Sequence, residues 1–436
     1  MRYCVGIDLG STTTKAVVLG EDAQVLGRGI TNSRSDYGVA CQVALVEALI
    51  AARFGLASAE LDDDGEPQAK ELLGVLERRF RFEQYRGQLG NLAAVLRGYT
   101  ADGGGAAPEC REPVEEILRR MEVEAEELYA EGSSRKSDFF RDLAGSRYHA
   151  LAEELARESD AGFDQLAGLF DKAILEVEGL PAEPASFRRH ADAALAGIEG
   201  APAALARGVQ RAAETELELA LSVGTGYGRA TLPFAKEQIR SEILCHGLGA
   251  HAMYPATRTV LDIGGQDTKA IQVDAQGIVT SFQMNDRCAA GCGRYLGYIA
   301  DEMNLGLHEI GPLACTSTRT VRINSTCTVF AGAELRERLG LGERREDILA
   351  GLHRAVILRA MSLLARSGGV EDEFSFTGGV AKNPAAVGAL RGLIEENYGE
   401  RTINISPESI YTGALGAALF ALRDWRRRGE REEVPS

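Results

Sequence analysis

The stretch that decides the fold is LDIGGQDTKA, residues Leu261–Ala270, in which an apolar strand runs into a turn of small residues and then into a second strand. Small residues let the backbone approach a phosphate, and the amides of such a turn can donate hydrogen bonds to it. QMNDRCAAGCGRYL and RINSTCTVFAGAE follow, and in them Cys288 and Cys327 each stand at the entry to a helical pattern. Since a helix N-terminus favours the thiolate form of cysteine, the stretch suggests a nucleotide site connected to a metal or redox site.

The beginning of the chain uses the same device in GIDLGSTTTK, where Asp8 ends a buried strand and Lys15 opens the next one. The turn between them is formed by Gly10, Ser11, Thr12 and Thr13. Its amides and hydroxyls, with the Lys15 charge, suit a phosphate, and the Asp8 carboxylate suits a hydrated Mg²⁺. Taken alone, this segment is equally compatible with an ordinary polar hairpin.

The two hairpins match position by position, since Asp262 corresponds to Asp8 and Lys269 to Lys15. A later strand, FSFTGGVAKNP, ends in a Gly-Gly turn at Gly378 and Gly379, where a bulky side chain would block a purine. A repeated phosphate hairpin followed by such a turn predicts two similar domains that face each other across a nucleotide.

The composition narrows the class of protein. With 436 residues, 45% of them hydrophobic, the chain can form two core-containing domains and has room for a third. The net charge of -16 argues against a nucleic-acid partner. We see neither a charge-free apolar stretch of roughly 18 residues nor a secretory signal, so we expect no membrane span and a cytoplasmic protein. The eight cysteines are then expected to be reduced, metal-bound or reactive.

Two further segments carry candidate residues. A helix is predicted across QIRSEILCHGLGAHAM, on which Glu242 and His246 are four residues apart and share a face. A metal pair and a structural, hydrogen-bonding role for His246 both stay open. The closing helix, YTGALGAALFALRDW, contains small residues that allow close backbone packing, namely Gly413, Gly416, Ala417 and Ala418.

Taken together, GIDLGSTTTK, DIGGQD, NDRCAAGCGR, STCTVFA, FTGGVAKN and GALGAAL resemble the BadF/BadG/BcrA/BcrD-type ATPases. This family comprises activators of 2-hydroxyacyl-CoA dehydratases and ATP-binding subunits of benzoyl-CoA reductase. The resemblance implies an α/β, actin/Hsp70/sugar-kinase-like (ribonuclease H-like) two-domain ATPase. The simple activators look like this chain without its large helical insertion. The insertion and the opening segment look more like the larger of the ATP-binding subunits of benzoyl-CoA reductase.

The resemblance implies a domain organisation. Residues 1–54 would begin the first ATPase domain, and 216–257 would complete it. Between them, 55–215 is rich in Glu, Arg, Ala and Leu at helical spacing and is predicted to be a mostly helical insertion, either a scaffold or a partner-docking surface. Residues 258–404 would form the second domain with the cluster cysteines, and 405–436 a closing strand and helix that return to the first domain.

By resemblance, Asp8 and Asp262 would hold Mg²⁺ through water, and Gln266 would orient the attacking water. The groups that would hold the phosphates are Lys15, the turn from Gly10 to Thr13, Gly264 and Gly265. Gly378 and Gly379 would flank adenosine, and Glu242 would line the cleft.

The resemblance also implies that Cys288 and Cys327 bind a [4Fe–4S] cluster shared between two subunits, since one such cluster takes about four cysteines. Its implied partners are a related smaller ATP-binding subunit that shares the cluster, acyl-CoA-binding reductase subunits, and ferredoxin as electron donor. Cys292 departs from the family, where Thr is usual, and is either a third ligand or a small substitute. The remaining cysteines, Cys4, Cys41, Cys110, Cys245 and Cys315, are expected to have no special role.

These implications favour an ATP-hydrolysing electron-donor component of benzoyl-CoA reductase, which reduces an aromatic acyl-CoA at the expense of ATP. The alternative in the same family is the activator of a 2-hydroxyacyl-CoA dehydratase. A sugar or acid kinase of this fold would need a catalytic carboxylate where the chain has Gln266, and it would leave Cys288 and Cys327 unexplained. A nucleotide-binding regulator without enzymatic activity would contain no iron.

Overall fold

The computed structural model describes residues 1–33, 36–101, 105–133, 135, 137–180, 186–229, 234–285, 291–319, 321–323 and 328–432. Contacts divide the chain into two compact units. The core unit consists of Met1–Ser33 and Leu217–Ser436, and the helical unit of Arg34–Glu216. The helical unit thus begins before the predicted boundary at residue 55, because α1 (Tyr37–Asp63) packs its apolar side against other helices of that unit.

The helical unit forms two buried apolar clusters of its own. Its other helices are α2 (Pro67–Thr100), α3 (Arg111–Leu128), α4 (Phe140–Leu155), α5 (Phe163–Glu178), α6 (Ser186–Ala196) and α7 (Ala203–Glu214), with a short 3-10 turn at Pro108–Cys110. The long α2 helix contributes to both clusters. In one of them Phe80 lies 5.3 Å from each of Phe54 and Phe187, measured between ring centroids. Burial of these rings explains why the predicted helical segments pack as a separate body.

The first sheet of the core unit has the strand order β3-β2-β1-β4. Its strands are β1 (Arg2–Leu9), β2 (Thr13–Gly20), β3 (Val25–Asn32) and β4 (Glu218–Thr225). The first three strands form an antiparallel meander, and β4 pairs in parallel with β1. The chain therefore leaves the sheet after β3 for the helical unit and returns to the opposite side of β1.

The second sheet repeats this topology as β7-β6-β5-β8, with β9 added at the edge. Its strands are β5 (Thr259–Ile263), β6 (Thr268–Val273), β7 (Val279–Asn285), β8 (Phe374–Thr377) and β9 (Ile403–Ile405). The apolar core of this sheet is completed by residues of α9 (Gly293–Glu302), α10 (Leu307–Cys315), α11 (Thr328–Gly340), α12 (Arg345–Ser367) and α13 (Pro384–Tyr398). β9 ends at Ile405, so of the described residues within 405–436 only the first is in a strand, and the predicted closing helix follows at Thr412–Glu432.

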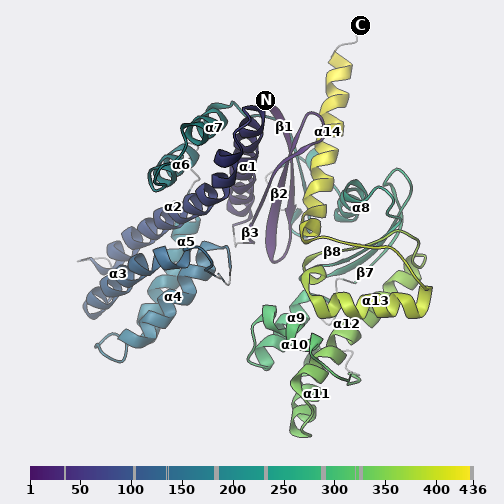
Figure 1. Ribbon diagram of the computed structural model, residues 1–436. Helices are drawn as coiled ribbons and strands as arrows, with labels where there is room; N and C mark the ends of the chain where they lie inside the picture. The colour runs from purple at the N-terminus through teal and green to yellow at the C-terminus, as the bar shows by residue number, and fades with distance from the viewer. Residues whose placement is uncertain are drawn as a thin grey trace. The chain divides into compact units, whose positions relative to one another are not determined.

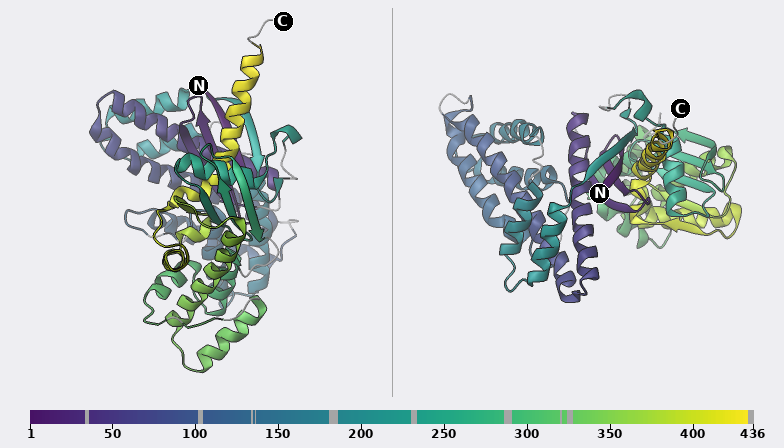
Figure 2. Two further views of the ribbon diagram at one scale, coloured as in Figure 1. Left: turned by 90° about the vertical axis from the view of Figure 1, so that its right-hand side faces the viewer. Right: turned by 90° about the horizontal axis from the view of Figure 1, so that it is seen from above.

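Helices α8 (Glu242–Met253) and α14 (Thr412–Glu432) join the two sheets. One side of α8 packs with α14 against β1 and β4, and the other side packs against β5 and β6. α14 runs alongside the strands of the first sheet (Figure 1; Figure 2). Short 3-10 turns lie at Lys236–Gln238, Gly379–Lys382 and Pro407–Tyr411. α8 is therefore placed to present side chains between the two sheets.

Two helices, α1 and α12, are long and apolar enough to cross a membrane by length and composition. The sequence-based criterion of a charge-free stretch excluded them, whereas this test accepts up to two charged residues. In α12, 61% of the tested window is buried inside the structure, and Leu352, Ile357 and Leu364 lie in the core of the second sheet. Core helices of globular proteins pass the same test, so these two helices do not by themselves indicate a membrane span.

The contact between α8 and α14 depends on glycine, as the sequence predicted for the closing helix. A Cβ atom on Gly416 would lie 1.9 Å from the carbonyl oxygen of Cys245, and one on Gly249 would lie 1.9 Å from that of Thr412. A Cβ on Gly6 of β1 would similarly meet the carbonyl oxygen of Ala414 at 2.0 Å. The backbones of α8, α14 and β1 are in direct contact at these points.

Gly416→Ala should therefore destabilise the protein by at least the roughly 1–3 kcal/mol typical of overpacking, since the obstructing atoms are backbone. Gly429→Ala is the matched control, because it lies in the same helix with no atom within 4 Å of an added Cβ. That change should stabilise the helix by up to about 1 kcal/mol. Chemical denaturation of the two variants measures both effects, and losses of equal size would contradict the packing argument.

Candidate active site

The two predicted phosphate hairpins occupy equivalent places in the two sheets. On the first sheet Asp8 lies opposite Lys15 of β2 on one side and opposite Thr225 of β4 on the other. On the second sheet the equivalent residues in the same register are Asp262, Lys269 and Thr377. The repeat inferred from sequence is thus a repeat in strand register, with a carboxylate, an amine and a hydroxyl side by side in each sheet.

The turns of the two hairpins touch each other. A Cβ atom on Gly265 would lie 2.5 Å from Oγ1 of Thr12 and 3.9 Å from Oγ of Ser11. Ser33 stabilises the first turn with two hydrogen bonds. Its amide donates to the Thr12 carbonyl at 2.8 Å, and its hydroxyl donates to the Gly10 carbonyl at 2.6 Å. Both predicted phosphate turns therefore belong to one site.

Asp8 is buried, and its Oδ1 atom has no hydrogen-bond partner among the described residues. Glycines surround the carboxylate: a Cβ on Gly226 would lie 2.5 Å from Oδ1, and one on Gly413 would lie 2.6 Å from Oδ2. A buried carboxylate without a partner is costly unless a cation or water neutralises or solvates it. The Asp8 carboxylate therefore fits a hydrated Mg²⁺.

Asp262 is equally buried but is well bonded. Thr377 donates from Oγ1 to Oδ2 of Asp262 at 2.7 Å, and Nδ1 of His246 lies 3.4 Å from the same oxygen. Nζ of Lys269 lies 3.6 Å from the other carboxylate oxygen. Burial alone would raise the pKa of Asp262, but these neighbours, His246 foremost, hold the pKa well below its usual range. Asp262 is therefore ionised at neutral pH.

His246 lies between the two aspartates, a position that sequence analysis did not predict. Its Nε2 is 3.9 Å from Oδ2 of Asp8 and also 3.9 Å from Oε1 of Glu242, while Nδ1 is 3.1 Å from Oγ1 of Thr412. Burial would lower the pKa of His246, but the Asp262 carboxylate outweighs burial and raises it. The spacing of Glu242 and His246 was visible in the sequence. The approach of Asp8 and Asp262 to His246 depends on the tertiary fold and was not.

The two hairpin lysines differ in their surroundings. Lys269 is 2% exposed and forms ion pairs with Asp267 at 2.6 Å and with Glu242 at 2.8 Å. Burial would lower the pKa of Lys269, but these carboxylates and Asp262 raise it well above its usual range. Lys15 is half-buried, and no described residue forms an ion pair with it. Lys15 is therefore the lysine available to an anion, while Lys269 neutralises the carboxylates around it.

The remaining predicted nucleotide residues lie near these turns. Gln266 is half-buried and hydrogen-bonds to no described residue, so its amide is available to a ligand. Gly378 has a φ of +87°, and a Cβ there would lie 2.4 Å from the Ile263 carbonyl oxygen, so glycine is required by the backbone itself. Gly379 has open space within 4 Å of the position of a Cβ. Gly264 and Gly265 form the second turn described above.

The predicted cluster ligands, Cys288 and Cys327, lie outside the described residues. Cys292 is buried and forms the N-cap position of α9. The other described cysteines are free thiols, exposed at Cys315 and buried at Cys4, Cys41, Cys110 and Cys245. Within the described part of the chain, no three His, Cys, Asp or Glu side chains are arranged as ligands of one metal ion.

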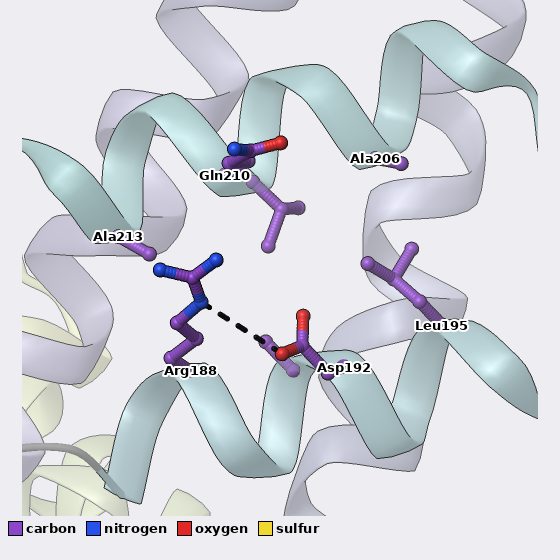
Figure 3. A pocket seen from close by; sticks show the side chains of 8 residues that line it. Arg188, Asp192, Leu195, Ala206, Gln210 and Ala213 are labelled. Atoms are coloured by element: carbon purple, nitrogen blue, oxygen red, sulfur yellow. Dashed lines mark ion pairs between the residues drawn. The ribbon is translucent and has the colours of Figure 1, made fainter.

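A cavity of about 110 Å³ lies between α6 and α7 of the helical unit (Figure 3). Its rim is polar, with Arg188 and Asp192 forming an ion pair at 3.9 Å, and its walls include Leu195 and Val209. Pockets for cofactor-sized ligands are usually about 300–1,000 Å³, so this cavity is too small to be a nucleotide site.

Comparison with known protein families decides between the candidate classes. A family model described as BadF/BadG/BcrA/BcrD ATPase family matches residues 5–421. The chain belongs to this ATPase family. The match includes both phosphate hairpins, the cysteine motifs and the Gly-Gly turn, so the family predicted from these motifs is confirmed.

Two relatives of this ATPase are activators of dehydratases. The (R)-2-hydroxyglutaryl-CoA dehydratase activating ATPase of Acidaminococcus fermentans is 41% identical over 227 residues, which is 52% of this chain and 85% of that protein. The activator of lactoyl-CoA dehydratase of Anaerotignum propionicum is 41% identical over 225 residues, 52% of this chain and 84% of that protein. One of the benzoyl-CoA reductase subunits of Thauera aromatica is 32% identical over 175 residues, 40% of this chain and 62% of that protein.

Solved structures show the same fold. The Acidaminococcus fermentans dehydratase component A aligns with a TM-score of 0.53 at 23% identity, covering 98% of this ATPase and 100% of that chain. The activator of 2-hydroxyisocaproyl-CoA dehydratase from Clostridium difficile, solved with ADPNP, aligns at 0.52 and 23% identity, covering 100% and 99%. The α/β, actin-like fold predicted from the motifs is therefore confirmed.

These relatives change the order of the functional interpretations. The sequence favoured benzoyl-CoA reductase because of the helical insertion and the opening segment. The relatives support its alternative better, since the two dehydratase activators are 41% identical to this ATPase and the reductase protein 32%.

Proposed function

We propose that this ATPase activates an enzyme of the 2-hydroxyacyl-CoA dehydratase type by delivering single electrons to it. The observation that carries the proposal is the 41% identity to two such activators, over 84–85% of their length. The partner would bind the acyl-CoA, so this chain would not contact the substrate.

The site supports ATP hydrolysis with distinct roles for its residues. Asp8 and Asp262 hold Mg²⁺ through water, and the two touching turns hold the phosphates with Lys15. Gln266, whose amide has no partner among the described residues, orients the attacking water. Glu242 lines the cleft and is kept in place by Lys269 at 2.8 Å. Gly378 and Gly379 flank adenosine, and the open space beside Gly379 accommodates it.

We further assign two ligand positions of an iron–sulfur cluster to Cys288 and Cys327, with a second copy of the chain or a related protein supplying the others. Bound there, a [4Fe–4S] cluster would supply single electrons at potentials down to roughly −700 mV. Raising an electron by a few hundred mV takes on the order of 10 kcal/mol, since about 59 mV corresponds to about 1.4 kcal/mol for one electron. ATP hydrolysis provides energy on this scale. We therefore propose a cytoplasmic location, where thiols stay reduced.

Anaerobic purification with iron and sulfide analysis tests the proposal. We expect about four irons per pair of cluster-binding chains, together with single-electron transfer that ATP drives and a non-hydrolysable analogue does not. Cys288→Ser and Cys327→Ser should each remove the iron and the electron transfer. Equal transfer rates with ATP and the analogue, or an iron-free chain, would overturn it.

Electron donation to a benzoyl-CoA reductase is the second candidate, supported by the helical insertion and by the 32% identity to the Thauera aromatica reductase protein. Its partners would be a related smaller ATP-binding subunit, acyl-CoA-binding subunits and ferredoxin. Mass spectrometry of the native complex separates the two candidates. Assays of ATP-dependent 2-hydroxyacyl-CoA dehydration and of benzoyl-CoA reduction should agree with the subunits found.

A further inference from the structure

The second phosphate turn is hydrogen-bonded to the start of α9. The amide of Gly293 donates to the carbonyl of Gly264 at 2.8 Å, and the amide of Arg294 donates to the carbonyl of Gly265 at 2.8 Å. A Cβ on Gly293 would lie 3.2 Å from that Gly264 oxygen, so the contact is close. The α9 N-cap residue, Cys292, makes no side-chain capping bond. The turn therefore satisfies amides that a helix N-terminus otherwise leaves unpaired.

Thr268 adds a third bond between the same two segments. It is the first residue of β6, is 1% exposed, and donates from Oγ1 to the carbonyl of Gly291 at 2.6 Å. Gly291 directly follows residues 286–290, the segment that carries Cys288 in the sequence. The turn, the strand after it and the beginning of α9 are thus joined by three hydrogen bonds.

Peptide geometry makes these bonds mechanically important. The carbonyl of Gly264 and the amide of Gly265 belong to one rigid peptide plane, as do the carbonyl of Gly265 and the amide of Gln266. An amide that rotates towards a phosphate must therefore rotate the carbonyl on which α9 is bonded. The first turn differs, because its Gly10 and Thr12 carbonyls are bonded to Ser33 at the end of β3.

We propose that the peptide planes Gly264–Gly265 and Gly265–Gln266 relay occupancy of the phosphate site to helix α9, and that Thr268 is the positioning residue that holds Gly291, just before α9, against the turn. This relay deepens the proposed function, on which it rests. The relay assigns the coupling with α9 to the second hairpin, and it requires no movement of the first turn.

The test is hydrogen exchange of α9, measured by mass spectrometry on wild-type protein and Thr268→Val with and without Mg²⁺ and ADP or a non-hydrolysable ATP analogue. The peptide followed starts upstream of Gly291. In the wild type we expect exchange in α9 to change on nucleotide binding. In Thr268→Val, exchange without nucleotide should be about fivefold faster, the equivalent of one lost hydrogen bond. The nucleotide-dependent change should then be lost while nucleotide affinity is kept.

Two further variants separate positioning from damage to the fold. Thr259→Val removes two other hydrogen bonds of a buried hydroxyl in the same sheet, the donation from Thr259 Oγ1 to Gln272 at 2.9 Å and the acceptance from the Glu371 amide at 2.9 Å, and should keep the α9 response. Thr268→Ser keeps the hydroxyl and should restore it. The relay would be overturned if Thr268→Val kept the wild-type change in α9 exchange. It would also be overturned if α9 exchange in the wild type did not change when nucleotide binds. A wild type that binds no nucleotide would overturn the proposed function itself.

Discussion

Asp8→Asn is expected to reduce ATP hydrolysis by about 100- to 1,000-fold, the scale on which loss of a single charge-stabilising group acts. The same change should leave the protein as stable as the wild type, or more stable. Oδ1 of Asp8 is buried without a described partner, and in the absence of a cation the cost of the buried charge is offset mainly by His246, whose Nε2 lies 3.9 Å from Oδ2. An amide removes that charge, and with it the group that would bind the water shell of Mg²⁺.

Asp262→Asn is the matched comparison, because Asp262 occupies the same register position on the second sheet. This carboxylate accepts from Thr377 at 2.7 Å and lies close to His246 and Lys269, so removing its charge leaves buried partners unsatisfied. We expect a loss of about 3–5 kcal/mol in unfolding free energy. ATPase rates and chemical denaturation of both variants provide the test. If Asp8→Asn were the less stable protein of the two, Asp8 could not be the carboxylate that is left open to Mg²⁺.

Local features of the site could be predicted from sequence because they lie within single hairpins. The order of Asp8, the small-residue turn and Lys15 is set by adjacent residues, and the same holds at Asp262 and Lys269. The closing helix was predictable for a similar reason, since small residues such as Gly416 indicate close backbone contact wherever the helix docks.

Contacts that depend on tertiary register could not be predicted in this way. His246 was recognised only as a neighbour of Glu242, because nothing in its own helix indicates that Asp8 and Asp262 approach it from different sheets. The start of the helical unit was placed at residue 55 because composition changes there, whereas packing places the boundary at Arg34. The choice between dehydratase and reductase partners also lay beyond the motifs, because a dehydratase activator and a reductase subunit are both relatives of this chain.

Replacing the two hairpin lysines should separate stability from nucleotide binding. Lys269→Met would leave Glu242, Asp267 and Asp262 without the amine that lies 2.6–3.6 Å from each of them. Removing one partner of a buried ion pair costs about 3–5 kcal/mol, so this variant should be severely destabilised. Lys15→Met should change stability by no more than about 0.5 kcal/mol, since no described residue pairs with Lys15.

Lys15→Met, which should hardly change stability, should instead weaken nucleotide binding. Loss of the Lys15 charge removes a charge-assisted hydrogen bond to phosphate, worth about 1.5–3 kcal/mol, so Lys15→Met should bind ATP roughly 10- to 100-fold more weakly. Calorimetry on Lys15→Met and denaturation of both variants are the measurements. If Lys15→Met unfolded as easily as Lys269→Met, the difference drawn between the two lysines would not hold.

The pH dependence tests whether the Lys269→Met loss is electrostatic. In the wild type, the raised pKa of Lys269 means that its stabilisation is complete below the ordinary lysine value of about 10.4 and is lost only as pH rises through the higher folded value. In Lys269→Met, burial raises the pKa of Glu242 with only His246 left to oppose it. The folded variant then binds more protons than the unfolded chain, so its stability should recover as pH falls from about 7 to about 5. A deficit that stays constant over this range would indicate lost packing instead of unpaired charge.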